Sequence, residues 1–399
     1  MTLYLDAAAS DSVSDTVIEA MIPFLTQAYA NPSSVHTDGK TAARALSAAR
    51  ESIAQNLGSR PNEIIFTSGG TESDNLAIKG IALAHVRNSH AHHGDASGDS
   101  RSRRILISAV EHPAVAESAQ WLHDFFGFEV VRIPVDAQAR IDLEALQEEV
   151  HKGATLACVM MANNEVGTIE PVKEAVRICH EAGVPVHVDA VQAAGTIPVD
   201  FHDLDADTLT ASGHKFGAPK GLGILCKRSR VGMEPLISGG GQEGGLRSGT
   251  PNVAGAVGLA VALQEACSRM PTMIPALESS RDELINAVLH AVPFSRLTGD
   301  PNSRLPGHAS FVFPGINAEA LLVDLDTRGI EVSSGSACAI GRSTAPSTLL
   351  AMGMSETEAK SALRISFREP LSSNDRESII KGLLSSLAEL HITISHVHA

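Results

Sequence analysis

The sequence has 399 residues, enough for two domains, and 43% of them are hydrophobic, enough for a sizeable core. Its 31 basic and 46 acidic residues give a net charge of −15, which argues against binding to a nucleic-acid backbone or to an anionic membrane surface. No apolar run reaches the length of a membrane span, and residues 1–6 lack the pattern of a secretory signal.

Short apolar runs alternate with segments of helical period up to Thr250. Apolar residues at helical spacing, closed by Gly58, predict the first helix, and a Gly-Gly turn separates the next strand from the next helix. Strands that alternate with helices are typical of a mostly parallel sheet with helices on both faces. The predicted strands are 63–67, 104–108, 156–161, 184–189 and 208–211, and the predicted helices are 40–57, 71 onward, 114–125 and 171–182.

After Thr250 the pattern changes to long helical segments with short strands between them. Asn374 is predicted to cap the last amphipathic helix. The fold class is therefore α/β, with a large domain over residues 16–263 and a small α+β domain formed by residues 1–15 and 264–399. The other elements predicted in this part are helices 252–270, 273–291 and 318–328 and strands 308–313 and 363–366.

Residues 88–103 form a polar insertion that is predicted to be a loop. Its histidines, His90, His92 and His93, are predicted to be solvated rather than to bind metal, and we expect no metal site in the chain.

The cysteines are odd in number and widely spaced, without any Cys-x-x-Cys pair. This excludes a disulfide framework or a zinc ribbon and favours a reducing compartment, so we predict a cytoplasmic location. Cys338 differs from the rest because it follows Ser333-Ser334-Gly335-Ser336-Ala337, a run without bulk that is typical of an exposed loop. A thiol in such a loop is available as a thiolate nucleophile. The other cysteines lie in apolar segments and are predicted to pack as small hydrophobic side chains, namely Cys158, Cys179, Cys226 and Cys267.

A strand, a Gly-Gly turn and a helix start follow one another around Gly70 and Thr71. Backbone N–H groups at a helix start favour a phosphate, and glycine lets the backbone approach a ligand closely. Many such turns are only turns, and the Gly-Lys-Ser/Thr ending of a nucleoside-triphosphate loop is missing.

Asp189 ends a predicted buried strand, where ligands of α/β proteins bind. Such a carboxylate keeps a pyridine nitrogen protonated, and Gln192, three residues further on, is expected to reach a ring hydroxyl. By itself, Asp189 is also consistent with a helix cap or a turn.

Lys215 follows the next predicted strand, within Ser212-Gly213-His214-Lys215. Its small and apolar flanks differ from those of an ordinary surface lysine, and desolvation frees a lysine amine for imine formation. His112 and Asn164 follow two other strands, where a histidine can stack on a flat ring or move protons and an asparagine can bind a cofactor oxygen. Capping, core and turn roles are the alternatives for these two residues.

Arg364 lies in an apolar strand-like stretch, where a buried guanidinium requires an anionic partner. A substrate α-carboxylate and an internal ion pair are both consistent with this position.

In this order, the segments resemble those of the cysteine desulfurases, pyridoxal-phosphate enzymes of the class V aminotransferase family with fold type I, and most closely their group I subfamily. The resemblance covers essentially the whole chain. Three residues or pairs depart from the usual family pattern, namely Ala7, Gly244 and Ala339-Ile340. The segments that carry the resemblance are 4–6, 31–36, 67–73, 111–112, 163–167, 187–189, 212–215, 247–250, 333–338 and 364–366.

The resemblance implies a role for each matching residue. Lys215 would hold pyridoxal 5'-phosphate through a Schiff base, Asp189 would pair with its ring nitrogen, and His112 would stack on the ring and assist proton transfer. Cys338 would accept sulfur from L-cysteine as a persulfide and pass it to an acceptor such as an iron–sulfur scaffold protein. The remaining implied contacts are Gln192 and Asn164 to the ring hydroxyl, Gly70, Thr71, Ser212 and His214 to the phosphate, Thr250 to the phosphate from the second subunit of a homodimer, and Arg364, Asn31 and Asn163 to the substrate.

Three other functions share parts of this pattern. A selenocysteine lyase has the same scaffold, whereas another class V aminotransferase or an epimerase would not need the thiol of Cys338. A cofactor-free scaffold for iron–sulfur assembly would not need the polar residues that are predicted to meet at the strand ends.

Overall fold

The structure is a computed structural model that describes residues 2–91, 103–335 and 345–397. Its large sheet has seven strands in the order β2-β8-β7-β6-β5-β3-β4. Only β8 runs antiparallel to its neighbours, so the sheet is mostly parallel, as predicted. The strands are β2 (Ile64–Thr67), β3 (Arg104–Ser108), β4 (Glu129–Ile133), β5 (Leu156–Met160), β6 (Val186–Asp189), β7 (Thr208–Ser212) and β8 (Gly223–Lys227).

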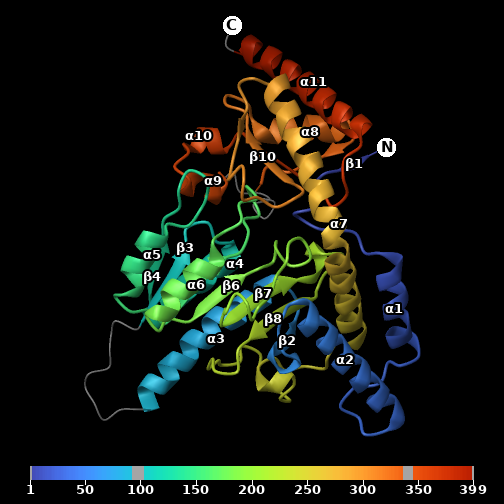
Figure 1. Cartoon of the computed structure of the whole chain (residues 1–399), viewed down its shortest axis with the longest axis vertical. Helices are drawn as coiled ribbons and strands as arrows, with labels where there is room; N and C mark the ends of the chain where they lie inside the picture. The colour runs from blue at the N-terminus through green and yellow to red at the C-terminus, as the bar shows by residue number, and fades with distance from the viewer. Residues whose placement is uncertain (1, 92–102, 336–344, 398–399) are drawn as a thin grey trace.

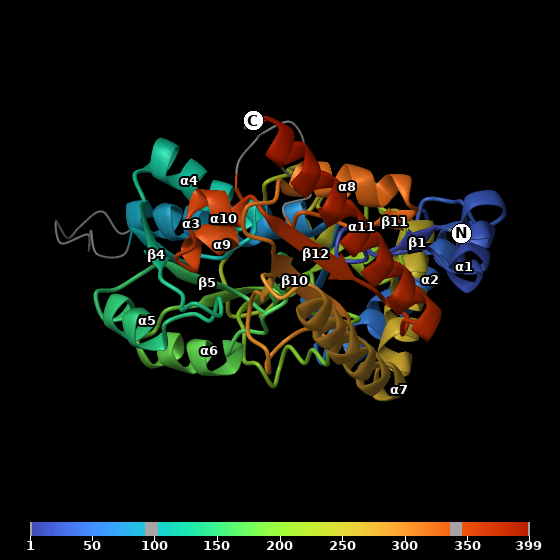
Figure 2. The same ribbon diagram turned by 90° about the horizontal axis from the view of Figure 1, so that it is seen from above.

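Helices cover both faces of this sheet because successive strand residues point to opposite sides. On β3, Ile105 and Ile107 pack with α3 and α4, whereas Leu106 belongs to the core shared with α2, α5, α6 and α7. Seen from above, α3 and α4 lie on one side and α5 and α6 on the other (Figure 2). The helical elements here are α1 (Asp15–Thr26), α2 (Thr37–Asn56), η1 (Pro61–Glu63), α3 (Gly70–Ala91), α4 (Pro113–Phe126), α5 (Leu143–Val150), α6 (Val172–Glu181), η3 (Gly213–Lys215) and η4 (Glu243–Gly245).

A smaller unit lies above the large sheet in Figure 1 and has its own core. Its antiparallel sheet has the order β12-β10-β9, and β1 pairs with β11 in parallel. Leu5, Phe311, Leu363 and Leu383 are among the residues of this second core. The elements are β1 (Leu3–Tyr4), β9 (Arg296–Leu297), β10 (His308–Val312), α8 (Ala318–Thr327), β11 (Ile330–Glu331), α9 (Ser347–Ala351), α10 (Glu356–Ala359), β12 (Ala362–Ser366) and α11 (Ser373–Val397).

One long helix, α7 (Val253–Ala291), joins the two cores. Leu259 packs in the core of the large sheet, and Leu284 packs in that of the small unit. Figure 1 shows α7 running from one unit to the other. The prediction of two helices here was wrong, because the chain stays helical through Pro271 and Pro275. A proline inside a helix costs about 3 kcal/mol, and packing of both ends of α7 offsets that cost.

Two smaller predictions were also wrong. The segment predicted as a loop from residue 88 is still helical up to Ala91. Of the rest of that insertion, only residue 103 is described, so His92 and His93 lie outside the described residues. The last helix is capped by Ser372 rather than by Asn374, because the Ser372 hydroxyl accepts a hydrogen bond of 3.1 Å from the N–H of Asp375. None of the helices in the described ranges is long and apolar enough to cross a membrane.

Candidate functional site

The polar residues that were predicted at the strand ends lie at one edge of the large sheet, beyond the carboxyl ends of its parallel strands. In open α/β sheets this edge is where ligands bind. The small unit covers it, since Arg364 of β12 donates a hydrogen bond of 2.8 Å to the carbonyl oxygen of Asn164, which follows β5. The strand ends carry Gly70 after β2, Glu111 and His112 after β3, Asn163 and Asn164 after β5, Asp189 and Gln192 at β6, and Ser212, His214 and Lys215 at β7.

Asp189 is a buried carboxylate in the floor of this site. Its Oδ1 accepts a hydrogen bond of 2.9 Å from the N–H of Val191. Burial and, after it, the charge of Asp74 raise its pKa to about 6, although the charges of His112 and His187 act in the opposite direction. A carboxylate that is costly to ionise in this way gains free energy from a cationic partner, such as a protonated ring nitrogen.

Asp74 and His187 form a buried pair beneath Asp189 that we did not predict. His187 Nε2 lies 3.1 Å from Asp74 Oδ1, and His187 Nδ1 lies 2.9 Å from the Thr208 hydroxyl. His187 and Asp189 lie two positions apart on β6 and therefore on the same side of the strand. The pair thus places one acidic and one basic side chain next to Asp189, and they shift its pKa in opposite directions. The only sequence signal for it was the presence of a histidine in an otherwise apolar strand.

Lys215 lies in the short η3 turn directly after β7. Its Nζ donates hydrogen bonds of 2.6 Å to the carbonyl oxygen of Ala8 and 3.0 Å to that of Ala9. Gln192 Nε2 donates a hydrogen bond of 3.0 Å to the same Ala8 oxygen. The N-terminal segment therefore brings the predicted lysine and glutamine together.

His112 is the N-cap residue of α4, and its Nδ1 accepts a hydrogen bond of 3.1 Å from the N–H of Ala114. This is the capping role that was one of its alternatives, and it leaves His112 near enough to Asp189 to lower the pKa of that carboxylate. A ring held by its backbone contact in this way presents a fixed face to the site.

Glu111, the residue before His112, is a functional candidate that sequence reasoning missed. It is buried, its Oε1 accepts a hydrogen bond of 2.6 Å from the N–H of Met160, and its Oε2 has no hydrogen-bond partner among the described residues. Burial, followed by the charge of Asp189, raises its pKa well above the usual range. The carboxyl of Glu111 therefore favours its protonated form more than an ordinary glutamate does. Its sequence signal was weak, because a glutamate before a helix cap is common on protein surfaces.

The start of α3 and the turn after β7 form a place for an anion. A Cβ on Gly70 would lie 2.8 Å from Val191 Cγ2 and 3.5 Å from Ser212 Cβ, so only glycine allows this close approach. Thr71 is exposed in the first turn of α3, and Ser212 is buried opposite. His214 Nδ1 is buried without a hydrogen-bond partner in the described part of the chain. Helix N–H groups, hydroxyls and an unpaired ring nitrogen together suit a phosphate.

His214 is electrically neutral in this arrangement. Burial, together with the charges of Lys215 and Lys220, lowers its pKa to about 4. A dianionic group bound beside it would oppose both effects.

Arg364 is buried and pairs with Asp6, which is the internal ion pair that the sequence had left open. One of its nitrogens also donates a hydrogen bond of 3.0 Å to the carbonyl oxygen of Gly335. Its Nε has no hydrogen-bond partner among the residues that the structure describes. The guanidinium therefore joins the N-terminal segment to the residues before Cys338 and keeps one donor for a ligand.

Asn163 is less suited to touching a substrate than predicted. Its side chain is fully buried, and its Oδ1 accepts hydrogen bonds from the N–H groups of Glu165 and Val166. Its Nδ2 donates to the Val110 carbonyl and to the Thr348 hydroxyl. The geometry therefore favours a positioning role for Asn163 over the predicted substrate contact.

Asn31 and Thr250 are exposed in the single chain. The hydrogen bonds of Asn31 within the described residues go to Ser33 and Ser34, next to it in sequence. Neither residue is thus joined to the strand ends by a hydrogen bond that lies in the described ranges. Cys338 and Ala339-Ile340 lie outside the described residues. Of the other cysteines, Cys158, Cys179 and Cys226 are buried as predicted, and Cys267 is partly buried.

Comparison with known proteins gives a consistent result along the chain. The family model described as aminotransferase class-V matches residues 3–377. The sequence is 42% identical to an IscS-like cysteine desulfurase of Mycobacterium tuberculosis over 96% of both chains. It is 36% identical to the cysteine desulfurase NifS of Azotobacter vinelandii, over 97% of this chain and 93% of the other.

Solved structures show the same similarity. A NifS-like protein superposes with a TM-score of 0.87 at 36% identity, over 98% of this chain and 100% of the other. A structure described as SspA in complex with cysteine superposes with a TM-score of 0.78 at 31% identity, over 93% of this chain and 100% of that one.

Proposed function

We propose, because the chain belongs to the aminotransferase class-V family and within it to the cysteine desulfurases, that it converts L-cysteine to L-alanine and passes the sulfur to Cys338. The substrate C–S bond breaks, an S–S bond to the Cys338 thiolate forms, and the proton of the substrate thiol ends on the new methyl group. Sulfur is therefore transferred in the oxidation state of a persulfide, and no external oxidant or reductant is needed for this step.

The observation that carries the proposal is the meeting of a lysine amine, a buried carboxylate and an unpartnered histidine nitrogen at the strand ends. Lys215, Asp189 and His214 supply these three groups. They suit the aldehyde, ring nitrogen and phosphate of pyridoxal 5'-phosphate, which we propose as the cofactor. When bound, this cofactor supplies an electron sink for charge that develops at the substrate α-carbon.

The residues around that cofactor would act as follows. Asp189 would keep a negative charge under the ring, and Gln192 and Asn164 would bind its hydroxyl side. Lys215, when its amine is free, would move a proton at the α-carbon, and the carbonyl oxygens of Ala8 and Ala9 would hold that amine in reach. His112 would stack on the ring and assist the second proton transfer. The phosphate would be bound by the turn at Gly70, by Thr71, Ser212 and His214, and by Thr250 from the second subunit.

We propose that the substrate carboxylate is bound by the remaining donor of Arg364, with Asn31 close to the substrate. Support for the first contact is the buried Nε of Arg364, which lacks a partner within the described ranges. A carboxylate there would add a charge-assisted hydrogen bond without breaking the ion pair with Asp6.

A homodimer is part of this proposal, because Thr250 and Asn31 are exposed in one chain. Support comes from helix α1, where Ile18, Ile22 and Leu25 are 45%, 47% and 61% exposed. They lie at spacings of three and four residues and so form one row on the side of α1 away from the buried Val17. An exposed apolar row of this kind is typical of an interface between chains.

A selenocysteine lyase has the same requirements at these positions, and a direct comparison of the two substrates separates the two activities. A cofactor-free scaffold would leave the buried carboxylate Asp189 without a cation. For the released sulfur we propose a protein acceptor of the iron–sulfur scaffold kind, and the cytoplasm remains the predicted location.

The deciding experiment measures alanine and sulfide from L-cysteine in the presence of pyridoxal phosphate and dithiothreitol. Cys338→Ala is expected to keep the bound cofactor and to lose turnover by a factor of at least about 1000. Cys267→Ala is the matched control, because burial raises the pKa of that thiol to about 11 and keeps it protonated. Full turnover in Cys338→Ala would show that the sulfur takes another route.

A further inference from the structure

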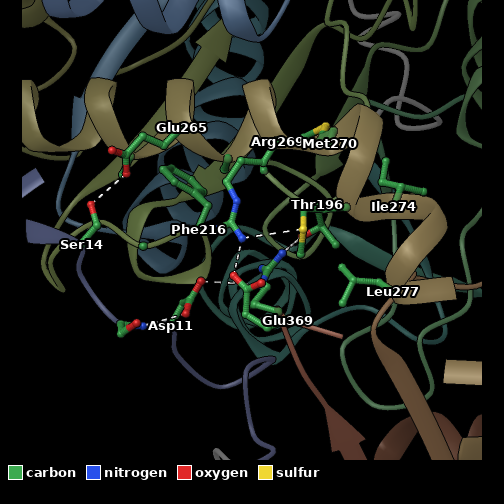
Figure 3. Close-up of a pocket in the computed structure, with 17 residues that line it drawn as sticks. Asp11, Ser14, Thr196, Phe216, Glu265, Arg269, Met270, Ile274, Leu277 and Glu369 are labelled. Carbon is green, nitrogen blue, oxygen red and sulfur yellow. Dashed lines mark hydrogen bonds and ion pairs between the residues drawn. The ribbon is translucent and has the colours of Figure 1, made fainter. Parts of the chain in front are cut away.

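A cavity of about 220 Å³ lies directly behind Lys215, against the next residues Phe216 and Gly217. Thr196, Phe216 and Glu369 surround it in Figure 3. Phe216 belongs to the core of the large sheet and Leu277 to that of the small unit, so the cavity marks the junction of the two cores. Side chains at this junction can transmit the position of one unit to the other.

Arg368 is the side chain of this cavity that touches the lysine segment. One terminal nitrogen of its guanidinium donates a hydrogen bond to the carbonyl oxygen of Lys215, and the other donates to the Thr196 hydroxyl. Its Nε lies 3.9 Å from Asp11 Oδ2. A planar guanidinium fixes the relative positions of the groups it binds, because its donors cannot move independently. Arg368 is also two residues beyond the end of β12, and so it moves with the small sheet.

The N-terminal segment also forms hydrogen bonds with the turn that contains Lys215. The N–H of Asp11 donates a hydrogen bond of 2.8 Å to the carbonyl oxygen of His214, and Ala8 and Ala9 bind the Lys215 amine. This segment is itself bonded to β12, since the N–H of Ala8 donates a hydrogen bond of 2.9 Å to the Ser366 hydroxyl. The contacts of Lys215 with Arg368 and with the N-terminal segment therefore both depend on β12 of the small unit.

We propose that Arg368 is a positioning residue for Lys215. It binds the peptide carbonyl of the lysine, ties it to Thr196, and thereby sets where the amine lies relative to Asp189. Within the described residues, its hydrogen bonds go to the Lys215 carbonyl and the Thr196 hydroxyl rather than to the amine. The inference rests on the proposed function for the role of the amine, and it adds that the small unit controls the lysine through its backbone. Small displacements of a catalytic group are costly, and about 1 Å can reduce a rate a hundredfold.

The test uses Arg368→Ala, with Arg269→Ala as the matched control. Arg269 lines the same cavity and pairs with Glu369, but its hydrogen bonds within the described residues do not reach Lys215. Reductive methylation of the apoprotein with formaldehyde and cyanoborohydride reports the reactivity of each lysine by peptide mass spectrometry. We expect Lys215 in Arg368→Ala to react at least about fivefold faster than in the wild type, because its turn is released. Arg269→Ala is expected to leave that rate unchanged, and the exposed Lys220 serves as the internal reference.

A second measurement uses the protein loaded with pyridoxal phosphate. The pH midpoint of its visible absorption is expected to shift in Arg368→Ala and to stay constant in Arg269→Ala. The shift is expected to be smaller in Arg368→Lys, which keeps the positive charge but not the planar pair of donors. If Arg368→Ala does not fold, Thr196→Val removes one of the two partners and is expected to increase methylation of Lys215 about twofold.

Equal methylation rates of Lys215 in the wild type, Arg368→Ala and Thr196→Val would overturn the proposal, even if the variants were less stable. The methylation test does not depend on catalysis. A faster rate in Arg368→Ala together with a protein that never binds pyridoxal phosphate would therefore refute the proposed function and leave the positioning role standing.

Discussion

The amine of Lys215 lies 2.6 Å from the carbonyl oxygen of Ala8, a residue 207 positions earlier in the chain. The N-terminal segment thus crosses from the small unit to the end of β7 and supplies backbone acceptors to the lysine. An ammonium held by two carbonyl oxygens has a defined place at the end of β7 before any cofactor binds. The following predictions test the parts of this arrangement one at a time.

Lys215→Ala is expected to abolish covalent attachment of pyridoxal phosphate and to reduce alanine formation by at least about 1000-fold, because no other amine replaces it at the end of β7. Absorption spectra before and after borohydride reduction, followed by mass spectrometry, measure the attachment. Lys220→Ala is the control, since Lys220 is exposed and is expected to leave the attachment intact. Attachment that persists in Lys215→Ala at another lysine would contradict the assignment.

Asp189→Asn is expected to stabilise the apoprotein at pH 7 while it destroys activity. The carboxyl has a pKa raised to about 6 by burial, above its value in the unfolded chain, so ionisation costs stability as the pH rises from about 4 to about 6. Above that range the cost is complete and amounts to about 3 kcal/mol, which the amide avoids. Urea unfolding of the wild type and of Asp189→Asn at pH 4 and pH 7 measures this difference in the free energy of unfolding. A difference that is the same at both pH values would contradict the assigned pKa.

Glu111→Gln is expected to change the unfolding free energy of the apoprotein at pH 7 by less than about 0.5 kcal/mol. Burial raises the pKa of Glu111 and so favours its protonated form, which an amide resembles in shape and charge. Glu111→Ala is the contrasting variant, because it leaves the N–H of Met160 without an acceptor at a cost of about 1–3 kcal/mol. Equal destabilisation by both substitutions would mean that Glu111 is ionised.

His214→Ala is expected to weaken binding of pyridoxal phosphate about tenfold and to leave binding of pyridoxal, which lacks the phosphate, unchanged. In the apoprotein, the His214 ring is expected to titrate near pH 4, since burial lowers its pKa to about 4. The neutral ring then favours folding above pH 6.5, and this contribution is lost as the pH falls from 6.5 towards 4. NMR titration of the ring, with and without phosphate, checks the value. Equal losses of affinity for pyridoxal and for its phosphate would place His214 away from the phosphate.

Replacement of Ile22 and Leu25 by Asp in one protein is expected to convert a dimer into a monomer, because two charges would enter the apolar row of α1. Analytical ultracentrifugation measures the mass. Phe125→Asp is the control, since Phe125 is 69% exposed on α4, away from this row. A dimer that survives the double substitution would assign the row to a different partner, such as the sulfur acceptor.

Much of the candidate site could be proposed from the sequence because its chemistry depends on residue types at strand ends. Asp189, Lys215 and His112 each follow an apolar run, and parallel strands bring their carboxyl ends to one edge. An ion pair of Arg364 was one alternative, but its partner Asp6 could not be predicted, since the two residues are 358 positions apart and only folding places them together. Glu111 was missed for a related reason, because the rise in its pKa comes from burial that only the folded chain provides.

The order of apolar runs, turns and polar residues was sufficient to predict the parallel sheet, its ligand-binding edge and the type of chemistry there. Local patterns carry that information because strand and helix periodicity is local. The contacts of Lys215 with Ala8, Ala9 and Arg368, and the continuity of α7 through Pro271, came from folding alone. Backbone carbonyl groups are the same at every residue, so no sequence pattern marks the one that a distant side chain will meet.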